Sequence, residues 1–242
     1  MAKYKVLSTK KLAPQLIDEA ERNDIQITQQ EFISVNPIIT KEKIKEVLNF
    51  ATSGKEYIAF TSANAVTPFD QYLHQYDTYY AVGWKIFCLE GKTKETVLNS
   101  LLPKKNIIAT AKNAMELSQK IIGHGVKEII FFCGNKRRND LPDSLTKAGI
   151  IVHEVVVYET LEVPAISTGD FNAILFFSPS AVNSFFSVNK FNTRVVCFAV
   201  GKTTANSITC LVPNKVITIE SPGEDMMIAS LKYYFKNINC YE

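Results

Sequence analysis

Short apolar runs alternate with amphipathic stretches along most of the chain. In the middle of the chain, strands are predicted near 57–61, 85–89, 106–109 and 128–133, and helices near 64–74, 92–101, 112–123 and 140–148. A longer β run covers 153–161, and the alternation then returns with strands near 173–177, 194–200 and 215–219 and helices near 179–187, 202–210 and 223–236. Each strand is apolar throughout rather than at every second residue, which is typical of strands buried on both faces of a helix-covered parallel sheet.

The chain ahead of this pattern holds fewer elements. A strand is predicted at 5–9 and an amphipathic helix at 11–22, followed by a β-rich run over 25–36 and a helix over 41–51. One strand and one helix before the β-rich run are too few for a domain, because a domain needs packed layers around its own core. We therefore expect the N-terminus to complete a sheet formed by the C-terminal part of the chain.

Two parts of the chain repeat each other. Residues 57–66 and 174–182 each form a short apolar strand that ends in hydroxyl residues and opens a helix, and Gly-Lys-Thr follows a later strand in both copies, at 91–93 and 201–203. The predicted fold class is α/β, with two similar three-layer domains that have parallel sheets and are joined by a two-stranded β-ladder linker. The expected divisions are a discontinuous domain of residues 1–30 plus 168–242, an inserted domain of residues 37–155, and linker strands at 27–36 and 152–166. A cleft between two such domains is a common site for a small ligand.

Composition narrows the classes of function. With 46% hydrophobic and 21% charged residues, the chain has the composition of a soluble globular protein, and a net charge of +3 is too small to indicate a nucleic-acid partner. No apolar run approaches the roughly 20 residues of a membrane-spanning helix, and the N-terminus has no signal-peptide core, so a cytoplasmic location without a membrane partner is expected. The scattered cysteines and isolated histidines predict buried reduced thiols and no metal site.

Hydroxyl and amide side chains gather where the two repeated strands end. Thr61, Ser62 and Asn64 follow one strand, and Ser178 and Ser180 follow the other. Such residues commonly cap helices by accepting hydrogen bonds from free backbone N–H groups. The same geometry favours ligand binding, because open α/β sheets bind ligands beyond the carboxyl ends of their strands and helix N-termini attract anions. Both interpretations stay open.

The two Gly-Lys-Thr segments resemble the end of a phosphate-binding loop. That loop needs another glycine five residues earlier, where Ile86 and Val196 stand instead, so nucleotide binding is not expected. What remains is a helix start at Gly201 with two nearby hydroxyls, Thr203 and Thr204.

A cationic segment and a tyrosine complete the candidate chemistry. Residues 134–140, Gly-Asn-Lys-Arg-Arg-Asn-Asp, follow a buried strand and open a helix, with three consecutive cations at 136–138. These cations either bind a polyanion or form a solvated surface run. Tyr158 lies in the second linker strand, where it either faces the cleft or packs as a structural strand tyrosine.

Taken in order, these segments resemble the uroporphyrinogen-III synthase family. The resemblance rests on five segments: Thr-Ser-x-Asn-Ala-Val at 61–66, Gly-Asn-x-x-Arg-x-x-Leu at 134–141, Val-Tyr-Glu-Thr at 157–160, Ser-Pro-Ser-Ala-Val at 178–182 and Ala-Val-Gly-Lys-Thr-Thr-Ala at 199–205. It implies a lyase of tetrapyrrole and haem biosynthesis that needs no metal or cofactor. The implied reaction cyclises linear hydroxymethylbilane, which carries eight carboxylates, with inversion of the last pyrrole ring and loss of water.

The resemblance also implies roles for residues. Tyr158 would be the general acid, and the family often carries an arginine where this chain has Lys10. The implied substrate-binding residues are Lys10, Thr61, Ser62, Asn64, Gly134, Asn135, Arg138, Ser178, Ser180, Gly201, Thr203 and Thr204. A monomer with a linear tetrapyrrole as its small-molecule partner is expected. The alternatives are a two-domain binding protein of the periplasmic type and an inactive binding or regulatory relative of the same fold.

Overall fold

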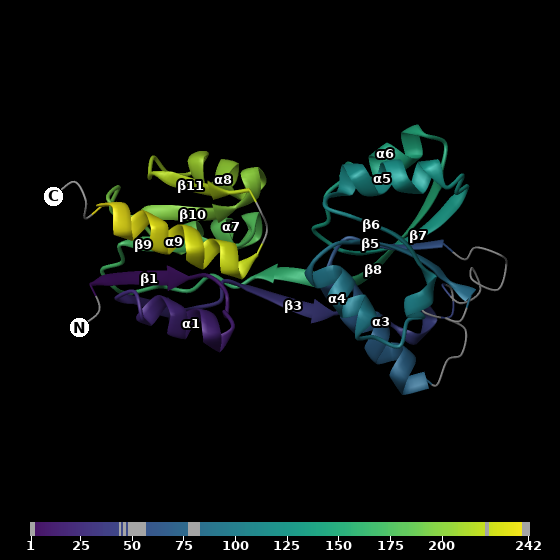
Figure 1. Ribbon diagram of the computed structural model, residues 1–242, viewed down its shortest axis with the longest axis horizontal. Coiled ribbons are helices and arrows are strands. Elements are labelled where there is room, and N and C mark those ends of the chain that lie inside the picture. The colour runs from purple at the N-terminus through teal and green to yellow at the C-terminus, as the bar shows by residue number, and fades with distance from the viewer. Residues whose placement is uncertain are drawn as a thin grey trace. The chain divides into compact units, whose positions relative to one another are not determined.

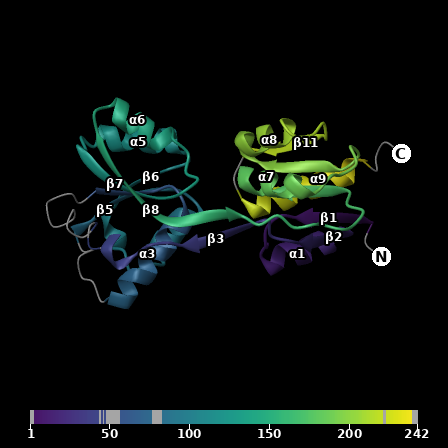
Figure 2. The ribbon, with the colours of Figure 1, turned by 180° about the vertical axis from the view of Figure 1, so that it is seen from behind.

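The chain folds into two compact units. The structure, a computed structural model, describes residues 3–43, 45, 47, 57–76, 83–220 and 223–238 and is seen from opposite sides in Figures 1 and 2. One unit comprises Met1–Ser34 with Leu161–Glu242, and the other comprises Val35–Thr160. The predicted α/β class with parallel sheets is confirmed, whereas the helix expected over 41–51 lies largely outside the described residues.

The discontinuous unit is built around a parallel sheet. Its described elements are β1 (Tyr4–Ser8), α1 (Pro14–Glu21), β2 (Ile25–Gln29), β9 (Ala173–Phe176), α7 (Pro179–Val188), β10 (Val196–Val200), α8 (Gly201–Thr209), β11 (Val216–Ile219) and α9 (Glu224–Ile238). The strands are ordered β11-β10-β9-β1-β2, and each neighbouring pair is parallel. The N-terminal strand β1 therefore lies between β9, from the C-terminal part of the chain, and β2.

Both faces of this sheet are covered by helices, which explains its continuous apolar strands. Val6 points into a core cluster with α1 and α9, and its neighbour Leu7 points into a second cluster with α7 and α8. Because successive side chains of a strand alternate between faces, a sheet buried on both sides needs an apolar residue at every position. Figures 1 and 2 show these two helix layers.

The inserted unit has the same layered design. Its described elements are β3 (Ile33–Pro37), β4 (Tyr57–Phe60), α3 (Ala63–Tyr76), β5 (Lys85–Leu89), α4 (Lys92–Leu98), the 3₁₀ helix η2 (Lys104–Asn106), β6 (Ile107–Ala111), α5 (Ala114–Gly123), β7 (Glu128–Gly134), α6 (Asp140–Lys147) and β8 (Ile151–Glu162). The strand order is β3-β8-β7-β4-β5-β6, with parallel pairing from β8 to β6. Phe132 packs against α3 and α4, while Phe131 packs against α5 and α6 on the opposite face.

The two sheets share one strand order. Read from the edge, β6-β5-β4-β7-β8 corresponds to β11-β10-β9-β1-β2, so that each repeated strand occupies the same place in its own sheet. The helices that follow corresponding strands also correspond, α3 with α7 and α4 with α8. The difference is where the chain enters, because after the linker strand β3 the inserted unit begins with β4, the strand equivalent to β9. The sequence repeat therefore reflects a structural repeat.

The two crossings between the units pair with each other. Val163 N donates to Phe32 O at 2.9 Å, and Ile38 N donates to Val157 O at 3.0 Å, so β3 and β8 run in opposite directions. One expectation was wrong, because residues 25–36 form two strands rather than one β-rich crossing. Gln30 N donates to Ser8 O, which ends the pairing of β2 with β1, and β3 begins three residues later.

Candidate active site

All of the predicted site residues lie at or beside one edge of each sheet. Strands of a parallel sheet all end at the same edge, and β8, β7 and β4 are neighbours in one unit as β1, β9 and β10 are in the other. The edge of the inserted unit carries Thr61, Ser62, Asn64, Gly134, Asn135, Arg138 and Tyr158. The edge of the discontinuous unit carries Lys10, Ser178, Ser180, Gly201, Thr203 and Thr204. Each edge has the location at which open α/β sheets bind ligands.

The hydroxyl cluster after β4 opens α3. Ser62 Oγ accepts a hydrogen bond from Asn64 N at 3.2 Å, and Ser62 O accepts from Ala65 N at 3.1 Å. Ser62 thus caps the helix and is itself half-buried, whereas Asn64 at the helix start is exposed. Thr61 is half-buried and makes no hydrogen bond through its hydroxyl to the residues that the structure describes. The capping interpretation therefore holds for Ser62, and Thr61 and Asn64 keep polar groups for a ligand.

Tyr158 lies against the end of β7. It pairs with Gly134 across a register shift, and its ring occupies the space where a β-carbon on Gly134 would be. Asn135 N donates to Tyr158 O at 3.2 Å, and Asn135 Oδ1 accepts from Thr160 N at 2.8 Å. The tyrosine is half-buried, and its hydroxyl makes no hydrogen bond within the described part of the chain. A phenol held this way can donate its proton to a ligand at this edge.

The three cations after β7 differ in what they contact. Arg137 forms a forked ion pair with Glu154 of β8, in which Nη2 lies 2.6 Å from Oε1 and Nε donates to Oε2, and its Nη1 donates to Asn139 Oδ1. The hydrogen bond to Glu154 raises the pKa of Arg137. Arg138 is exposed and has no ion pair with any residue that the structure describes. The cationic segment is thus divided between a structural arginine and an arginine available to a ligand.

The second repeated strand ends in a capping serine. Ser178 is the N-cap of α7, and its Oγ accepts a hydrogen bond from Ala181 N at 3.2 Å. Ser180 lies in the first turn of the same helix and is half-buried. As at the other edge, a serine caps the helix and a second hydroxyl beside it makes no capping hydrogen bond within the described residues.

The start of α8 shows which threonine a ligand can reach. Gly201 has a φ of 74°, a left-handed conformation that glycine adopts readily, and Gly91 has a φ of 67° at the equivalent place before α4. Thr203 is exposed, whereas Thr204 is 1% exposed. Thr204 was predicted to bind substrate, but its side chain is buried and offers almost no surface to a ligand.

Two carboxylates that pair with the cations of these segments were missed by the sequence analysis. Glu224, the first residue of α9, accepts a hydrogen bond from Lys10 Nζ, which also lies 5.5 Å from the centre of the Phe177 ring. Glu154 holds Arg137 in the same manner. Glu224 is 214 residues from Lys10 and Glu154 is 17 residues from Arg137, so no local motif links either carboxylate to its cation.

The strand cysteines behave as the sequence predicts, but the prediction of a buried thiol is wrong for Cys210. Cys88, Cys133 and Cys197 are buried free thiols on central strands, and burial raises their pKa values to about 11, 11 and 12 respectively. Cys210 is exposed. In the described ranges, no group of three or more His, Cys, Asp and Glu side chains has the arrangement of a metal site. The same part of the chain contains no helix with the length and hydropathy needed to cross a bilayer.

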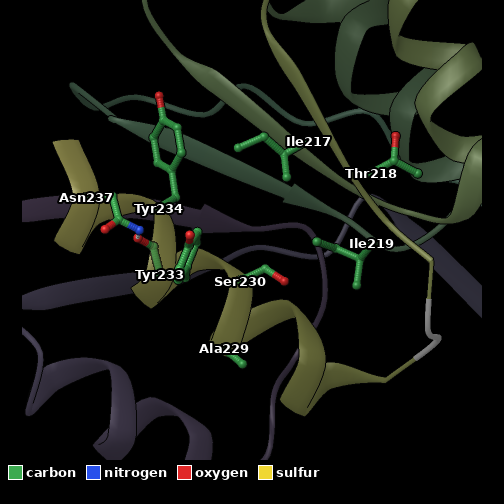
Figure 3. Close-up of a pocket in the computed structure, with 8 residues that line it drawn as sticks. All are labelled: Ile217, Thr218, Ile219, Ala229, Ser230, Tyr233, Tyr234 and Asn237. Atoms are coloured by element: carbon green, nitrogen blue, oxygen red, sulfur yellow. Dashed lines mark hydrogen bonds between the residues drawn. The ribbon is translucent and has the colours of Figure 1, made fainter.

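A cavity of about 600 Å³ lies between β11 and α9 and is lined by none of the predicted site residues (Figure 3). It is lined by Ile217, Thr218, Ile219, Ala229, Ser230, Tyr233, Tyr234 and Asn237. No lysine or arginine lines it and its walls are mostly apolar, so it does not suit a ligand with many carboxylates.

Comparison with known proteins places this fold in a defined class. The chain resembles a solved mutant uroporphyrinogen III synthase from the extremely thermophilic bacterium Thermus thermophilus, with a TM-score of 0.66 and 14% identity over 98% of this chain and 99% of that chain. It also resembles the uroporphyrinogen-III synthetase from Helicobacter pylori, with a TM-score of 0.65 and 14% identity over 96% and 99% of the two chains. At this identity the likeness defines the fold. None of the curated proteins matches the chain by sequence.

The family follows from the sequence itself. The model of the family described as uroporphyrinogen-III synthase HemD matches residues 14–229, which include parts of both units and every candidate site residue except Lys10. The chain belongs to the uroporphyrinogen-III synthase family, and the resemblance drawn from the five segments is confirmed. The family acts in tetrapyrrole biosynthesis on a small tetrapyrrole substrate.

Proposed function

We propose that the chain cyclises linear hydroxymethylbilane to the type III isomer of uroporphyrinogen, with inversion of the last pyrrole ring and loss of water. The observation that carries the proposal is the family match over 14–229, which includes every candidate site residue except Lys10. The polar character of these edges supports it, because eight substrate carboxylates call for several modest anion-binding groups rather than one deep charged pocket.

In the proposed first step, Tyr158 acts as general acid. Its phenol donates a proton to the terminal hydroxyl of the substrate as the carbon–oxygen bond breaks, and water leaves. The bonding electrons depart with the oxygen, and the pyrrole nitrogen stabilises the resulting cation. The last pyrrole ring then attacks that carbon through its substituted α-carbon, which forms a spiro centre. The older bond from this α-carbon to its methylene bridge breaks, and the bridge bonds instead to the free α-carbon of the same ring, so that the ring is inverted. The proton lost from that free α-carbon balances the one that the phenol donated. A positioned acid typically contributes a factor of about 10²–10⁴.

The carboxylates are proposed to bind at helix starts and to the exposed cation. The N-termini of α3, α7 and α8 offer backbone N–H groups and the hydroxyls of Thr61, Ser180 and Thr203. Arg138 adds a full charge. Lys10 can add another only if a carboxylate of the substrate displaces Glu224.

The test is to mix the purified chain with freshly generated hydroxymethylbilane and to separate the product isomers by chromatography after oxidation. The type III isomer is expected in excess without added metal or nucleotide. If only the symmetric isomer of spontaneous closure forms, the chain is an inactive relative and the proposal fails. We further propose that the chain is a monomer, and light scattering tests its mass. We also propose a cytoplasmic location, because the three buried free thiols fit a reducing compartment.

A further inference from the structure

We propose that Gly134 and Asn135 are positioning residues that hold the Tyr158 phenol at the strand ends, rather than residues that contact substrate. The inference rests on the proposed function, in which Tyr158 is the general acid. Three features of the inserted unit support it: a close approach, a β-bulge and a pair of hydrogen bonds.

The close approach involves Gly134. A β-carbon at this position would lie 2.3 Å from Tyr158 Cζ and 2.8 Å from the hydroxyl oxygen, much closer than atoms pack. Gly134 is not among the glycines with positive φ, so its backbone conformation suits other residues as well. The ring of Tyr158 is therefore what excludes a side chain here, and glycine allows the phenol to lie on the backbone at the end of β7.

The β-bulge turns Tyr158 toward that position. Cys133 pairs with Val156, but the next residue of β7, Gly134, pairs with Tyr158, so that Val157 is the extra residue of β8. In a regular strand, Val157 and Tyr158 would point to opposite faces. Here both pack against the same core cluster. The bulge thus changes the direction of one side chain, which is a recognised use of bulges near functional sites.

Asn135 fixes the backbone at the tyrosine and two residues after it. Its N–H donates to Tyr158 O at 3.2 Å, and its side-chain Oδ1 accepts from Thr160 N at 2.8 Å. The side-chain oxygen of Asn135 therefore already accepts a hydrogen bond within the protein and does not need one from a ligand. Gly134 and Asn135 together thus determine where the phenol lies.

A double-mutant cycle tests this inference. Gly134→Ala must displace the ring, so we expect kcat for the type III isomer to fall at least 10-fold with KM changed less than 3-fold. Gly123→Ala is the matched control, because Gly123 also lacks a positive φ and a β-carbon there meets nothing within 4 Å. In a Tyr158→Phe background, Gly134→Ala is expected to cost no more than a further 2-fold, since the proton it misplaces is already absent. An equal loss in both backgrounds overturns the inference, as does a Gly134→Ala enzyme with wild-type kcat.

Asn135 gives a second, independent variant. Asn135→Ala removes the acceptor for Thr160 N and should lower kcat, whereas Asn135→Asp keeps a carboxylate oxygen in that place and should restore kcat to within about 3-fold of wild type. If the asparagine instead binds a substrate carboxylate through its amide N–H, Asn135→Asp will be at least as impaired as Asn135→Ala. That order of activities contradicts the positioning role.

A readout that does not need activity separates this inference from the proposed function. Nitration of Tyr158 by tetranitromethane, followed by peptide mapping, should rise at least 3-fold in Gly134→Ala and stay unchanged in Gly123→Ala. An unchanged nitration rate overturns the positioning role even if the enzyme makes the type III isomer. Conversely, a wild-type chain that forms only the symmetric isomer removes the proposed function, whatever the nitration result.

Discussion

The same substitution at two adjacent arginines after β7 should affect two different properties, stability for Arg137 and KM for Arg138. Arg137 is held by Glu154 and Asn139, whereas Arg138 is exposed and has no ion pair within the described residues. We expect Arg137→Gln to lower the stability of the fold with little change in KM. Arg138→Gln should raise KM with no change in melting temperature.

The magnitudes follow from exposure and geometry. The Arg137 and Glu154 side chains are 27% and 31% exposed, and their forked geometry makes the pair stronger than an ordinary surface salt bridge. Arg137→Gln is therefore expected to lower the free energy of unfolding by about 1 kcal/mol. For a chain of this size that corresponds to a fall of about 2–4 °C in melting temperature. Loss of one exposed contact between Arg138 and a carboxylate, worth about 0.5–1 kcal/mol, raises KM roughly 2-fold to 5-fold.

The assays are thermal unfolding and initial rates of type III formation at low and high salt. The KM difference caused by Arg138→Gln should shrink at about 1 M salt, where the screening length is about 3 Å. Glu154→Gln is the matched control, since it breaks the same ion pair while leaving both arginines in place, and it should lower the melting temperature without raising KM. If Arg137→Gln raises KM as strongly as Arg138→Gln and leaves the melting temperature unchanged, the structural assignment of Arg137 is refuted.

Three further changes test other parts of the site. Tyr158→Phe should lower kcat by roughly 10-fold to 10³-fold and cost about 1 kcal/mol of stability or less, and full activity with unchanged melting would return this residue to a structural role. Glu224→Gln frees Lys10 and should lower KM about 2-fold to 5-fold, and an unchanged KM would exclude Lys10 from the binding of substrate. Iodoacetamide at neutral pH should label Cys210 in the native protein and spare the three strand thiols, whose pKa values burial raises to about 11 or 12, as peptide mapping by mass spectrometry can check.

Much of the architecture could be read from the sequence, because burial on both faces leaves a clear apolar signal in each strand. The division of residues 25–36 could not. No glycine or proline separates β2 from β3, and the boundary depends on Gln30 N reaching Ser8 O on a different strand. That contact is tertiary, so a local pattern cannot indicate it.

The candidate site shows the same distinction between features that local sequence indicates and features that depend on tertiary contacts. The strand-end hydroxyls were found because their position depends on where a strand stops, which the sequence indicates well. Which cations are available depends on distant carboxylates, and neither Glu154 nor Glu224 is close to its partner in sequence. The burial of Thr204 likewise depends on helix packing, because adjacent residues at a helix start can point to solvent or to the core.

The place of β1 beside β9 determines the order in which the chain can fold during synthesis. This strand is made well before its neighbour β9, which begins only at Ala173, after the whole inserted unit. The inserted unit is contiguous and can fold as soon as β8 has been made. The pairing of β3 with β8 then brings Phe32 and Val163 together and shortens the loop still to be closed roughly fivefold, which lowers the entropic cost of joining β1 to β9 by about 1.4 kcal/mol. A destabilised inserted unit should therefore delay the other unit as well, with the N-terminal strand and helix left exposed to proteases until the last strands emerge.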